Sequence, residues 1–417
     1  MKVLVVGRGG REHAIVKKLS QDTRIVEVFA APGNDGMVEA TLVKIDETDV
    51  VKLAEFAEFE QIDLTVVGPE SALMAGVIDE FQTRGLKAFG PNQNAALIEG
   101  SKAFAKQIMS KYDIPTATYG EFTDVEEAIK YLNSQKMPIV IKADGLAAGK
   151  GVVICQTLEE AASTVTEMMV DRSFGDASSK VVIEEFLDGE EFSLMSFVSG
   201  EIYKPMLIAR DYKRAYDNDE GLNTGGMGAH SPHPKVTDAD YEVALRTVVE
   251  PTVKALVVEG IPFTGILYAG LIQTAEGPKV IEFNARFGDP ETEVILPLLE
   301  TELADIMLGL LDGQDVELKW SQDATVGVVL ASSGYPLSYE NGAVIEGLDE
   351  LQGVDTYHMG TKFVDSKYTT NGGRVLFVVG RAANLPDACT KVYKEIEKIK
   401  CDNLFYRQDI ARVFCDQ

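Results

Sequence analysis

The stretch Lys279–Glu293, with the sequence KVIEFNARFGDPETE, carries the clearest chemical pattern in the chain. Its apolar first part predicts a strand over residues 280–284. Side chains two positions apart on a strand share a face, so Glu282 and Asn284 should point the same way. One charged and one neutral oxygen donor suit a hard cation such as Mg²⁺. Arg286 follows on this face if the strand continues, and a guanidinium can bind two phosphate oxygens. The pattern predicts a nucleoside triphosphate site with its metal; a solvated edge strand is the alternative.

Composition favours a globular, multi-domain protein that works on small molecules. The chain has 417 residues, 45% of them hydrophobic, and a formal net charge of −27. This length allows roughly two to four domains. The negative charge argues against nucleic acid or an anionic membrane as partner. No apolar run is long enough for a membrane span, no secretory pattern precedes the first strand, and the four scattered cysteines suggest reduced thiols, so we expect a cytoplasmic protein.

The N-terminal segment predicts an anion site. An apolar strand at residues 2–6 leads into Gly7, Gly9 and Gly10, and a helix pattern follows. Backbone N–H groups at such a helix N-terminus favour phosphate. A dinucleotide is less favoured, because Glu12 stands at the third glycine position and no acidic residue closes the second strand. We therefore expect the Gly9 and Gly10 backbone to bind a phosphate, with a simple packing turn as the alternative.

Alternating strands and helices predict a parallel sheet in the first hundred residues. Strands at residues 26–30 and 64–67 are followed by Asn34 and Glu70. In a parallel sheet the C-terminal ends of strands lie at one edge. Asn34 and Glu70 should therefore lie near Gly9, in a unit that ends near residue 100.

A hairpin flap is predicted next. Strands at 138–142 and 152–155 enclose a loop of small residues that Lys142 and Lys150 flank. The loop is not a Walker A motif, because its glycines are one residue too close and Gly151 stands at the Ser or Thr position. We expect its lysines to cover phosphates, with a plain mobile hairpin as the alternative. Strands at 180–186 and 192–198 then enclose an acidic connection whose backbone could contact a base.

The segment 209–230 is polar and glycine-rich, and it predicts a long loop without secondary structure. Such loops are often functional, and its candidate substrate contacts are Asp211, Lys213, Arg214 and Asp217. A flexible surface loop is the alternative. His230 and His233 are expected not to bind metal, because flanking prolines prevent a helix that would pair them. Beyond it we predict a helix at 239–259 that Pro251 divides, and a strand at 265–271 antiparallel to the metal strand. A last unit begins near residue 324, with no residue of obvious chemistry.

Taken in order, these segments resemble the ATP-grasp ligases, and within them the phosphoribosylamine–glycine ligase (glycinamide ribonucleotide synthetase) family. The resemblance covers nearly the whole chain. Arg8 in the first turn and Ala411 near the C-terminus depart from the family pattern. The motifs that carry it are GGREHA at 9–14, PGN at 32–34, GPE at 68–70, SKAFAK at 101–106, IKADGLAAGKGV at 141–152, IEEFLDGEE at 183–191, NTGGMGA at 223–229, LYAGL at 267–271, EFNARFGDPE at 282–291, HMGT at 358–361 and NGGRVL at 371–376.

The resemblance implies an α/β protein, α+β in part, with an ATP-grasp fold. It implies a Rossmann-like pre-ATP-grasp domain at 1–100, an ATP-grasp domain at 101–323 with a flap at about 117–190, and a small α/β domain at 324–417. Mg²⁺ or Mn²⁺ would bind Glu282 and Asn284, while Gly270 stands near the place of a second acidic ligand. The implied nucleotide contacts are Lys102, Lys142, Gly149, Lys150, Gly151, Glu184, Glu185, Phe186, Leu187 and Glu191.

The activity implied by the resemblance is ATP-dependent ligation of glycine to 5-phosphoribosylamine through glycyl phosphate, in purine synthesis. Arg286 and Asp211 are the expected catalytic residues. The enzyme is expected to be a monomer. Two alternatives stay open: another ATP-grasp ligase or carboxylase of purine synthesis, and a nucleotide sensor without catalysis. The expected substrate-binding residues are Gly9, Gly10, Asn34, Glu70, Lys213 and Asp217.

Overall fold

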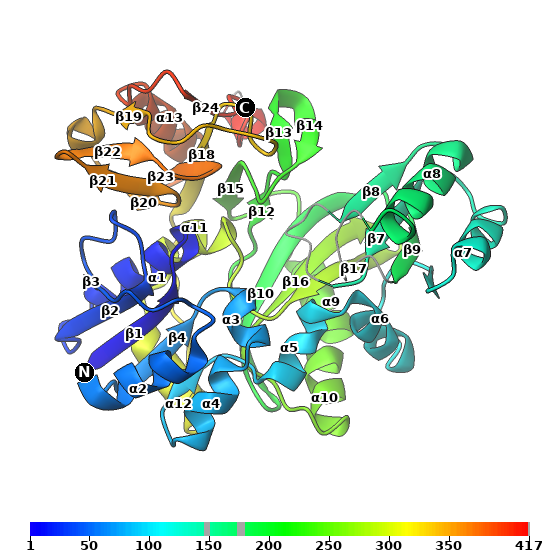
Figure 1. Cartoon of the computed structure of the whole chain (residues 1–417), viewed down its shortest axis with the longest axis horizontal. Coiled ribbons are helices and arrows are strands. Elements are labelled where there is room, and N and C mark those ends of the chain that lie inside the picture. The colour runs from blue at the N-terminus through cyan, green and yellow to red at the C-terminus, as the bar shows by residue number, and fades with distance from the viewer. Residues whose placement is uncertain (146–150, 173–179, 416–417) are drawn as a thin grey trace.

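The computed structural model describes residues 1–145, 151–172 and 180–415, and it shows a mixed α/β molecule. Figure 1 shows three regions around a common centre. The N-terminal sheet lies at the lower left, the C-terminal strands lie above it, and the flap strands extend to the right. The strongly twisted strands β10, β16 and β17 run between them. This arrangement confirms the predicted α/β class and the ATP-grasp fold.

The first sheet is five-stranded and parallel, in the order β3-β2-β1-β4-β5. Val3 to Val6 of β1 are fully buried, as is usual for a parallel strand covered on both faces. The C-terminal ends of β1, β2 and β4 lie at one edge, as predicted. The strands are β1 (Lys2–Gly7), β2 (Glu27–Pro32), β3 (Thr41–Leu42), β4 (Leu64–Val67) and β5 (Ala88–Phe89), and the helices are α1 (Gly10–Ser20), α2 (Val50–Glu60), α3 (Glu70–Met74), α4 (Val77–Thr83) and α5 (Gln93–Gly100).

The predicted flap hairpin is present. Strands β7 and β8 pair antiparallel, with Lys142 opposite Val152, and β9 pairs with the other edge of β7. The tip of the hairpin, residues 146–150, lies outside the described residues. The elements of this region are α6 (Lys102–Lys111), β6 (Tyr119–Phe122), α7 (Val125–Leu132), β7 (Ile139–Ala143), β8 (Val152–Cys155), α8 (Leu158–Met169) and β9 (Val181–Glu185).

A four-stranded sheet in the order β11-β10-β16-β17 carries the motif strand. The predicted antiparallel pairing of β16 with β17 is confirmed, and it places Gly270 opposite Glu282. The predicted helix at 239–259 is divided by a π-helical turn, Leu245–Val249, just before Pro251. The remaining bounds are β10 (Glu190–Ser199), β11 (Ile202–Pro205), α9 (Asp238–Ala244), α10 (Glu250–Val258), β16 (Thr264–Thr274), β17 (Gly277–Asn284), α11 (Glu291–Ile295) and α12 (Leu303–Leu311).

The segment 209–230 is not the structureless loop that its composition predicts. Its two ends form strands of the C-terminal sheet, in the order β12-β15-β18-β23-β20, and its middle forms the hairpin β13–β14. Polar and glycine residues concealed these strands, because β15 is stabilised by pairing with the apolar strand β18, and β12 by pairing with β15. The strands are β12 (Arg210–Asp211), β13 (Arg214–Tyr216), β14 (Glu220–Asn223), β15 (Gly228–Ser231), β18 (Ala324–Ser332), β20 (Val354–His358), β23 (Arg374–Ala382) and β24 (Leu404–Phe405), beside β19 (Val344–Ile345), β21 (Thr361–Val364), β22 (Lys367–Thr370) and α13 (Leu385–Ile396).

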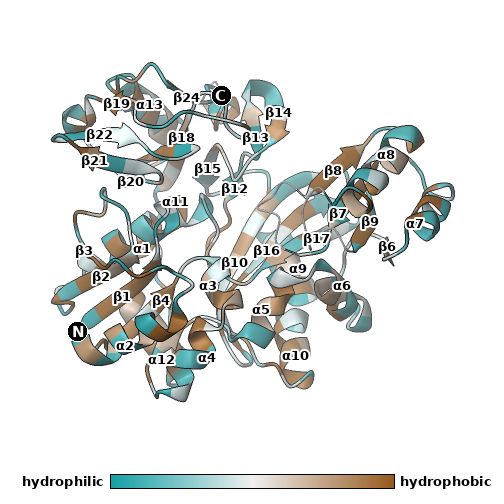
Figure 2. Cartoon of the chain, viewed as in Figure 1, coloured by the Kyte–Doolittle hydropathy of each residue, from teal (hydrophilic) through white to brown (hydrophobic). Residues whose placement is uncertain are grey.

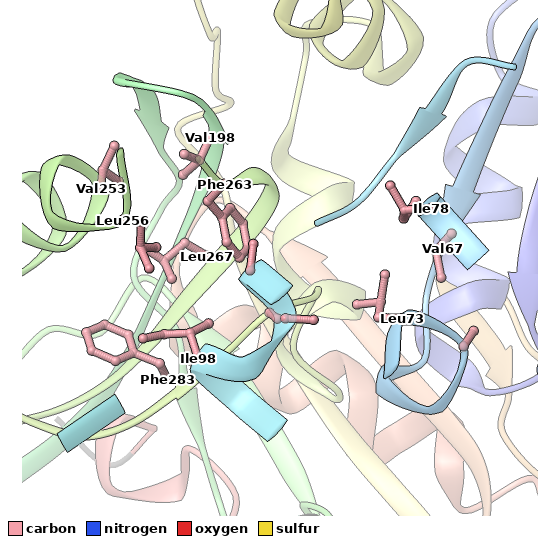
Figure 3. Close-up of a cluster of buried hydrophobic side chains, with 14 of the residues drawn as sticks. Val67, Leu73, Ile78, Ile98, Val198, Val253, Leu256, Phe263, Leu267 and Phe283 are labelled. Atoms are coloured by element: carbon pink, nitrogen blue, oxygen red, sulfur yellow. The ribbon is translucent and has the colours of Figure 1, made fainter. Parts of the chain in front are cut away.

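Shared apolar packing fixes the sheets relative to one another. One buried cluster joins Val67 and Leu73 of the N-terminal region to Phe263, Leu267 and Phe283 beside the motif strand. Figure 3 shows these side chains on either side of α5, and Figure 2 shows the brown, hydrophobic strands at the centre of each region. Close packing leaves the sheets little room to move relative to one another, so the functional side chains on them are held at fixed separations. Among the described residues, no helix is both long and apolar enough to cross a membrane.

Candidate active site

A cavity of about 720 Å³ lies where the sheets meet, and residues from all along the chain line it. Most of the side chains predicted from the sequence reach this one cavity. Gly149 and Lys150, in the flap tip, lie outside the described residues. The predicted residues that line the cavity are Glu70, Lys102, Lys142, Gly151, Glu184, Glu185, Phe186, Leu187, Glu191, Asp211, Lys213, Arg214, Glu282, Asn284 and Arg286.

Strand β17 presents the two candidate metal ligands to the cavity. Glu282 lies opposite Gly270 and Asn284 lies opposite Tyr268, so both side chains are on one face as predicted. Burial opposes the ionisation of Glu282, but Lys213, Lys142 and Lys102 outweigh it and lower the pKa of this carboxyl. The described residues contain no cluster of three or more acidic, His or Cys side chains placed to hold a metal. Two oxygen donors fit a divalent cation that takes its other ligands from phosphate and water.

Arg286 is fixed at the end of β17 by two carboxylates of the N-terminal region. It lies 2.9 Å from an oxygen of Glu99 and 3.3 Å from one of Glu70, and it contacts Asn284 Oδ1 at 3.4 Å. Glu99 also accepts the N–H of Ala285 at 2.8 Å. Burial opposes ionisation of Glu70, yet Arg286 and Arg11 outweigh it and lower its pKa to about 2. The guanidinium is therefore held in one orientation beside the candidate metal ligands.

A lysine cluster lines the flap side of the cavity. Lys102 donates to the carbonyl of Gly145 at 2.8 Å, and Lys142 donates to the carbonyl of Ile281 at 2.9 Å. Glu184 lies 3.0 Å from Lys142 and 3.2 Å from Lys106. Burial lowers the pKa of Lys102, and that of Lys106 to about 8. Several cations held out of water beside one carboxylate favour binding of a polyanion such as a polyphosphate.

The opposite wall carries a mixed acidic group. Lys213 forms an ion pair with Glu191 at 3.1 Å. Burial raises the pKa of the neighbouring Asp211 to about 8, against the opposing charge of Lys213. Glu291, which follows the motif strand, accepts hydrogen bonds from Ser193 at 2.7 Å and from Tyr268 at 2.8 Å. The predicted residues Asp211 and Lys213 thus lie in the cavity beside the metal strand.

The N-terminal turn differs from a simple anion site. The Gly9 N–H donates to Glu12 at 2.6 Å, so a carboxylate of the chain occupies the position that a phosphate would take. A Cβ on Gly10 would lie 2.7 Å from Glu293 Oε1. Asn34 donates to the carbonyl oxygens of Arg8 and His358. Within the described part of the chain these predicted residues do not line the cavity, so their role in substrate binding stays a prediction.

Asp217 also lies away from the cavity lining that the structure describes. Its carboxylate accepts the N–H of Gln408 at 2.8 Å and so fastens the C-terminal segment. His230 and His233 pack edge-to-face with ring centroids 5.5 Å apart, and both are buried. Substrate binding by Asp217 stays a prediction, and its observed contact is with the C-terminal segment.

Sequence reasoning missed several cavity residues. Arg374 of β23 reaches the cavity and contacts Asp289 Oδ1 at 2.8 Å and the Gly225 carbonyl at 2.7 Å. Arg11 and Glu99 line it as well. Arg374 stands in the quoted NGGRVL motif, whose glycines were the available signal; Glu99 lies within an otherwise ordinary helix. The last unit of the chain therefore contributes a charged side chain to the cavity lining, which its sequence did not indicate.

Comparison with known proteins accounts for this arrangement. Residues 1–99, 100–292 and 325–413 match the models of the phosphoribosylglycinamide synthetase N domain, ATP-grasp (A) domain and C domain. The chain is 54% identical to the phosphoribosylamine–glycine ligase of Halalkalibacterium halodurans over 99% of this chain and 96% of the relative. It is 54% identical to that of Listeria monocytogenes, over 99% of both chains.

Solved structures agree with the sequence relatives. The crystal structure of phosphoribosylamine–glycine ligase from Thermotoga maritima matches with a TM-score of 0.86 and 33% identity, over 98% of this chain and 100% of that one. A biotin carboxylase from Campylobacter jejuni matches with a TM-score of 0.75 at 14% identity, over 100% and 95% of the two chains, which shows a shared fold. The chain therefore belongs to the phosphoribosylglycinamide synthetase family, and it is an ATP-dependent carbon–nitrogen ligase of purine biosynthesis.

Proposed function

We propose that the cavity joins glycine to 5-phosphoribosylamine, with conversion of ATP to ADP and phosphate, and releases N-(5-phosphoribosyl)glycinamide. The observation that carries the proposal is the convergence of Glu282, Asn284 and Arg286 with the Lys102 and Lys142 ammonium groups in one cavity. A carboxylate does not acylate an amine directly, because its oxygen is too basic to leave. Transfer of a phosphoryl group to that oxygen gives glycyl phosphate, which an amine can attack.

Positioning and charge neutralisation supply most of the catalysis in such a transfer. Lys102 and Lys142 would neutralise the nucleotide phosphates, and Arg286 the phosphoryl group as it moves to the glycine carboxylate. Glu282 and Asn284 would hold a divalent cation, which would supply further positive charge beside the phosphates. The carboxylates of Glu70 and Glu99 hold the Arg286 fork in place before substrate arrives. Mg²⁺ is our first choice of metal, because its preferred oxygen ligands match this donor set, and Mn²⁺ would fit the same donors.

The nucleotide would lie under the flap, between Lys142 and the segment that follows β9. Glu184, Glu185, Phe186 and Leu187 line that side of the cavity, and Glu191 lies at its far end. Glu184 is buried and its Oε1 has no hydrogen-bond partner among the described residues. A buried acceptor that lacks a donor costs free energy, so a nucleotide N–H or O–H would satisfy it. We propose that Gly149, Lys150 and Gly151 contact the phosphates.

The phosphoribosyl group would reach the cavity from the N-terminal region. Glu70 lines the cavity there, and Gly9, Gly10 and Asn34 follow the neighbouring strand ends. Since Glu12 already accepts the Gly9 N–H, phosphate binding at this turn would require Glu12 to move. Lys213 and Asp217 are further proposed substrate contacts.

We propose a cytoplasmic monomer with small-molecule substrates and neither nucleic acid nor membrane as partner. The supporting observations are the net charge of −27 and the four free cysteines, of which Cys155 and Cys389 are buried. Light scattering coupled to size-exclusion chromatography measures the molar mass directly. A single species near the chain mass of 45.4 kDa supports the monomer, and twice that mass contradicts it.

A coupled assay of ADP release tests the reaction, with each substrate omitted in turn. ADP release should require both glycine and phosphoribosylamine. Dependence on bicarbonate instead of glycine would identify a carboxylase, and binding of ATP without ADP release would identify a sensor.

A further inference from the structure

Asp211 is an acidic side chain of the cavity whose charge the protein leaves without a partner. It ends the short strand β12 and lies opposite Ala229 of β15. It lines the main cavity and also a smaller hollow beside Gly270, which Ser193, Lys213 and Tyr268 also line and which is too small to hold a ligand by itself. In the described part of the chain its carboxylate forms no hydrogen bond and no ion pair within 4.0 Å. Its surroundings therefore decide what it can bind.

The other charged groups around Asp211 are already engaged. Lys213 is paired with Glu191 at 3.1 Å. Glu291 accepts two hydroxyl hydrogen bonds, from Ser193 and Tyr268. Glu282 is a candidate metal ligand on β17. Among the described residues Asp211 thus has no ion-pair partner, and the carboxylates of Glu191, Glu282 and Glu291 lie around it together with the Lys213 ammonium.

Two hydroxyl groups add hydrogen-bond acceptors to this hollow. Ser193 Oγ and Tyr268 OH lie 2.9 Å apart and each lies within 2.8 Å of Glu291 Oε1. Each hydroxyl carries one proton, and donation of both to Glu291 leaves their oxygen lone pairs free. Gly270 lies opposite both Ser193 and Glu282 across the sheet, so this side of the cavity adjoins the metal strand. Where the hollow meets the main cavity, the Asp211 carboxylate and the Tyr268 hydroxyl offer acceptors to a small cation in the cavity.

Glycine places its two charged groups only one carbon apart. In the reaction proposed above, Arg286 faces the phosphoryl group that moves to the glycine carboxylate, so this carboxylate would lie near Arg286 and the metal strand. The ammonium group would then also lie close to β17, and Asp211 lines the same cavity beside that strand. An ammonium group carries three donors and needs acceptors or a carboxylate once it leaves water.

We infer that Asp211 receives the ammonium group of the glycine substrate, beside the Ser193 and Tyr268 hydroxyls. This assignment rests on the proposed function, and it gives Arg286 and Asp211 different roles in the cavity. Arg286 neutralises the phosphoryl group that the glycine carboxylate receives, whereas Asp211 orients glycine through the ammonium group, which does not react. An acid without an ammonium group would bind the same cavity poorly, because it would leave the Asp211 carboxylate without a cation.

The test compares Asp211→Asn with the wild type in the coupled assay. The wild type first establishes that ADP release requires glycine. Asp211→Asn keeps the shape and removes the charge, so the KM for glycine should rise roughly ten- to hundred-fold, while the KM values for ATP and phosphoribosylamine change less than about three-fold. Asp402→Asn is the matched control, since Asp402 is exposed in the C-terminal region and should leave all three values unchanged.

A second measurement uses the wild-type enzyme, so its result does not depend on how well the variant folds. Glycolate has the carboxylate of glycine but a hydroxyl in place of the ammonium group. It should inhibit the wild type only at concentrations roughly a hundred-fold above the KM for glycine.

The inference is overturned if glycolate competes as well as glycine. It is also overturned if a folded Asp211→Asn enzyme keeps its KM for glycine and loses kcat alone, because Asp211 would then handle a proton of the attacking amine. Absence of any glycine requirement in the wild type would instead overturn the proposed function itself, and the inference with it.

Discussion

At the scale of single residues, the candidate metal ligands Glu282 and Asn284 and the nearby Arg286 could be predicted from the sequence. The residues that hold Arg286 in place could not. Glu282, Asn284 and Arg286 follow from a period of two along an apolar strand. Glu99 holds Arg286 from a helix nearly two hundred residues away in the sequence, and no local pattern marks it. The contacts of a site are made by tertiary packing, so sequence periodicity finds the groups on one element and misses their partners on another.

Removing the charge of Glu282 tests the metal assignment. Glu282→Gln preserves the shape of the side chain but weakens its affinity for a divalent cation. We expect kcat/KM to fall by about a hundred-fold or more, with partial recovery at high Mg²⁺. A Mg²⁺ titration of the activity, with thermal unfolding to confirm the fold, makes the measurement. Wild-type activity across the titration would refute the assignment.

Arg286→Lys tests whether the fork geometry or only the charge matters. Arginine presents paired donors, whereas lysine presents a point charge that cannot contact Glu99 and a phosphoryl group in the same way. Loss of an oriented donor to the transferred group should lower kcat by roughly 10²- to 10³-fold. Steady-state kinetics measures it. A kcat close to that of the wild type would show that charge alone suffices and that Glu70 and Glu99 have no positioning role.

At the scale of elements, the regular parts of the fold followed from sequence and the segment 209–230 did not. The parallel N-terminal sheet, the flap hairpin and the β16–β17 pair were all predicted, because apolar runs and glycine punctuation mark them. Strands β12 and β15 are short and polar, and they exist because β18 pairs with β15 and β15 pairs with β12. Asp211 and Lys213 line the cavity, and polar side chains of this kind also make the segment resemble a loop in the sequence.

Gly226 tests whether this segment is as tightly fixed as the structure shows. Its φ is +112°, and a Cβ there would lie 2.4 Å from Pro290 Cδ. Gly226→Ala should lower the free energy of unfolding by about 1–3 kcal/mol and reduce activity, because Pro290 adjoins Asp289 and Arg374 of the cavity. Gly200→Ala is the control, since Gly200 also has a positive φ (+60°) but nothing within 4 Å of its Cβ position.

Chemical denaturation of both variants gives the comparison. A cost for Gly226→Ala no larger than that for Gly200→Ala would mean that the contact with Pro290 relaxes freely and that the segment is loosely held.

At the scale of the whole molecule, buried histidines connect its regions and make stability depend on pH. His358 of β20 donates its backbone N–H to His13 Nδ1 of α1, which joins the C-terminal to the N-terminal region. Burial lowers the pKa of His358 to about 3 and that of His233 to about 4. Arg210 and Lys235 also disfavour protonation of His233, Glu190 opposes them, and the ring of His230 packs against it. Those that face His358 are His13 and Lys17, against Glu39.

These depressed values predict acid destabilisation. Above the ordinary histidine pKa of about 6.5, both states are neutral and no effect arises. As pH falls from about 6.5 toward 4, only the unfolded chain gains the protons, so each histidine removes about 1.4 kcal/mol of stability per pH unit. Denaturant unfolding at several pH values measures the slope. His233→Asn should reduce that slope, and an unchanged slope would show that His233 titrates normally in the folded protein.

The division of the chain into domains is also a property of the whole molecule. We propose boundaries of 1–100, 101–323 and 324–417, with a flap subdomain at about 117–190. The sheet of the last region takes β12 and β15 from the middle of the chain, and one apolar cluster links the first region to the central sheet. Such interleaving cannot be predicted from boundaries in sequence, because strand exchange depends on where the chain returns in space.

The central claim is that a glycyl phosphate forms between Arg286 and the metal strand. Its most direct test is a turnover with glycine labelled by ¹⁸O in both carboxylate oxygens. Attack of the amine on the acyl carbon expels phosphate together with the bridging oxygen, so each phosphate released should carry one ¹⁸O atom from glycine, as read by mass spectrometry. Turnover that yields N-(5-phosphoribosyl)glycinamide and unlabelled phosphate would contradict the account.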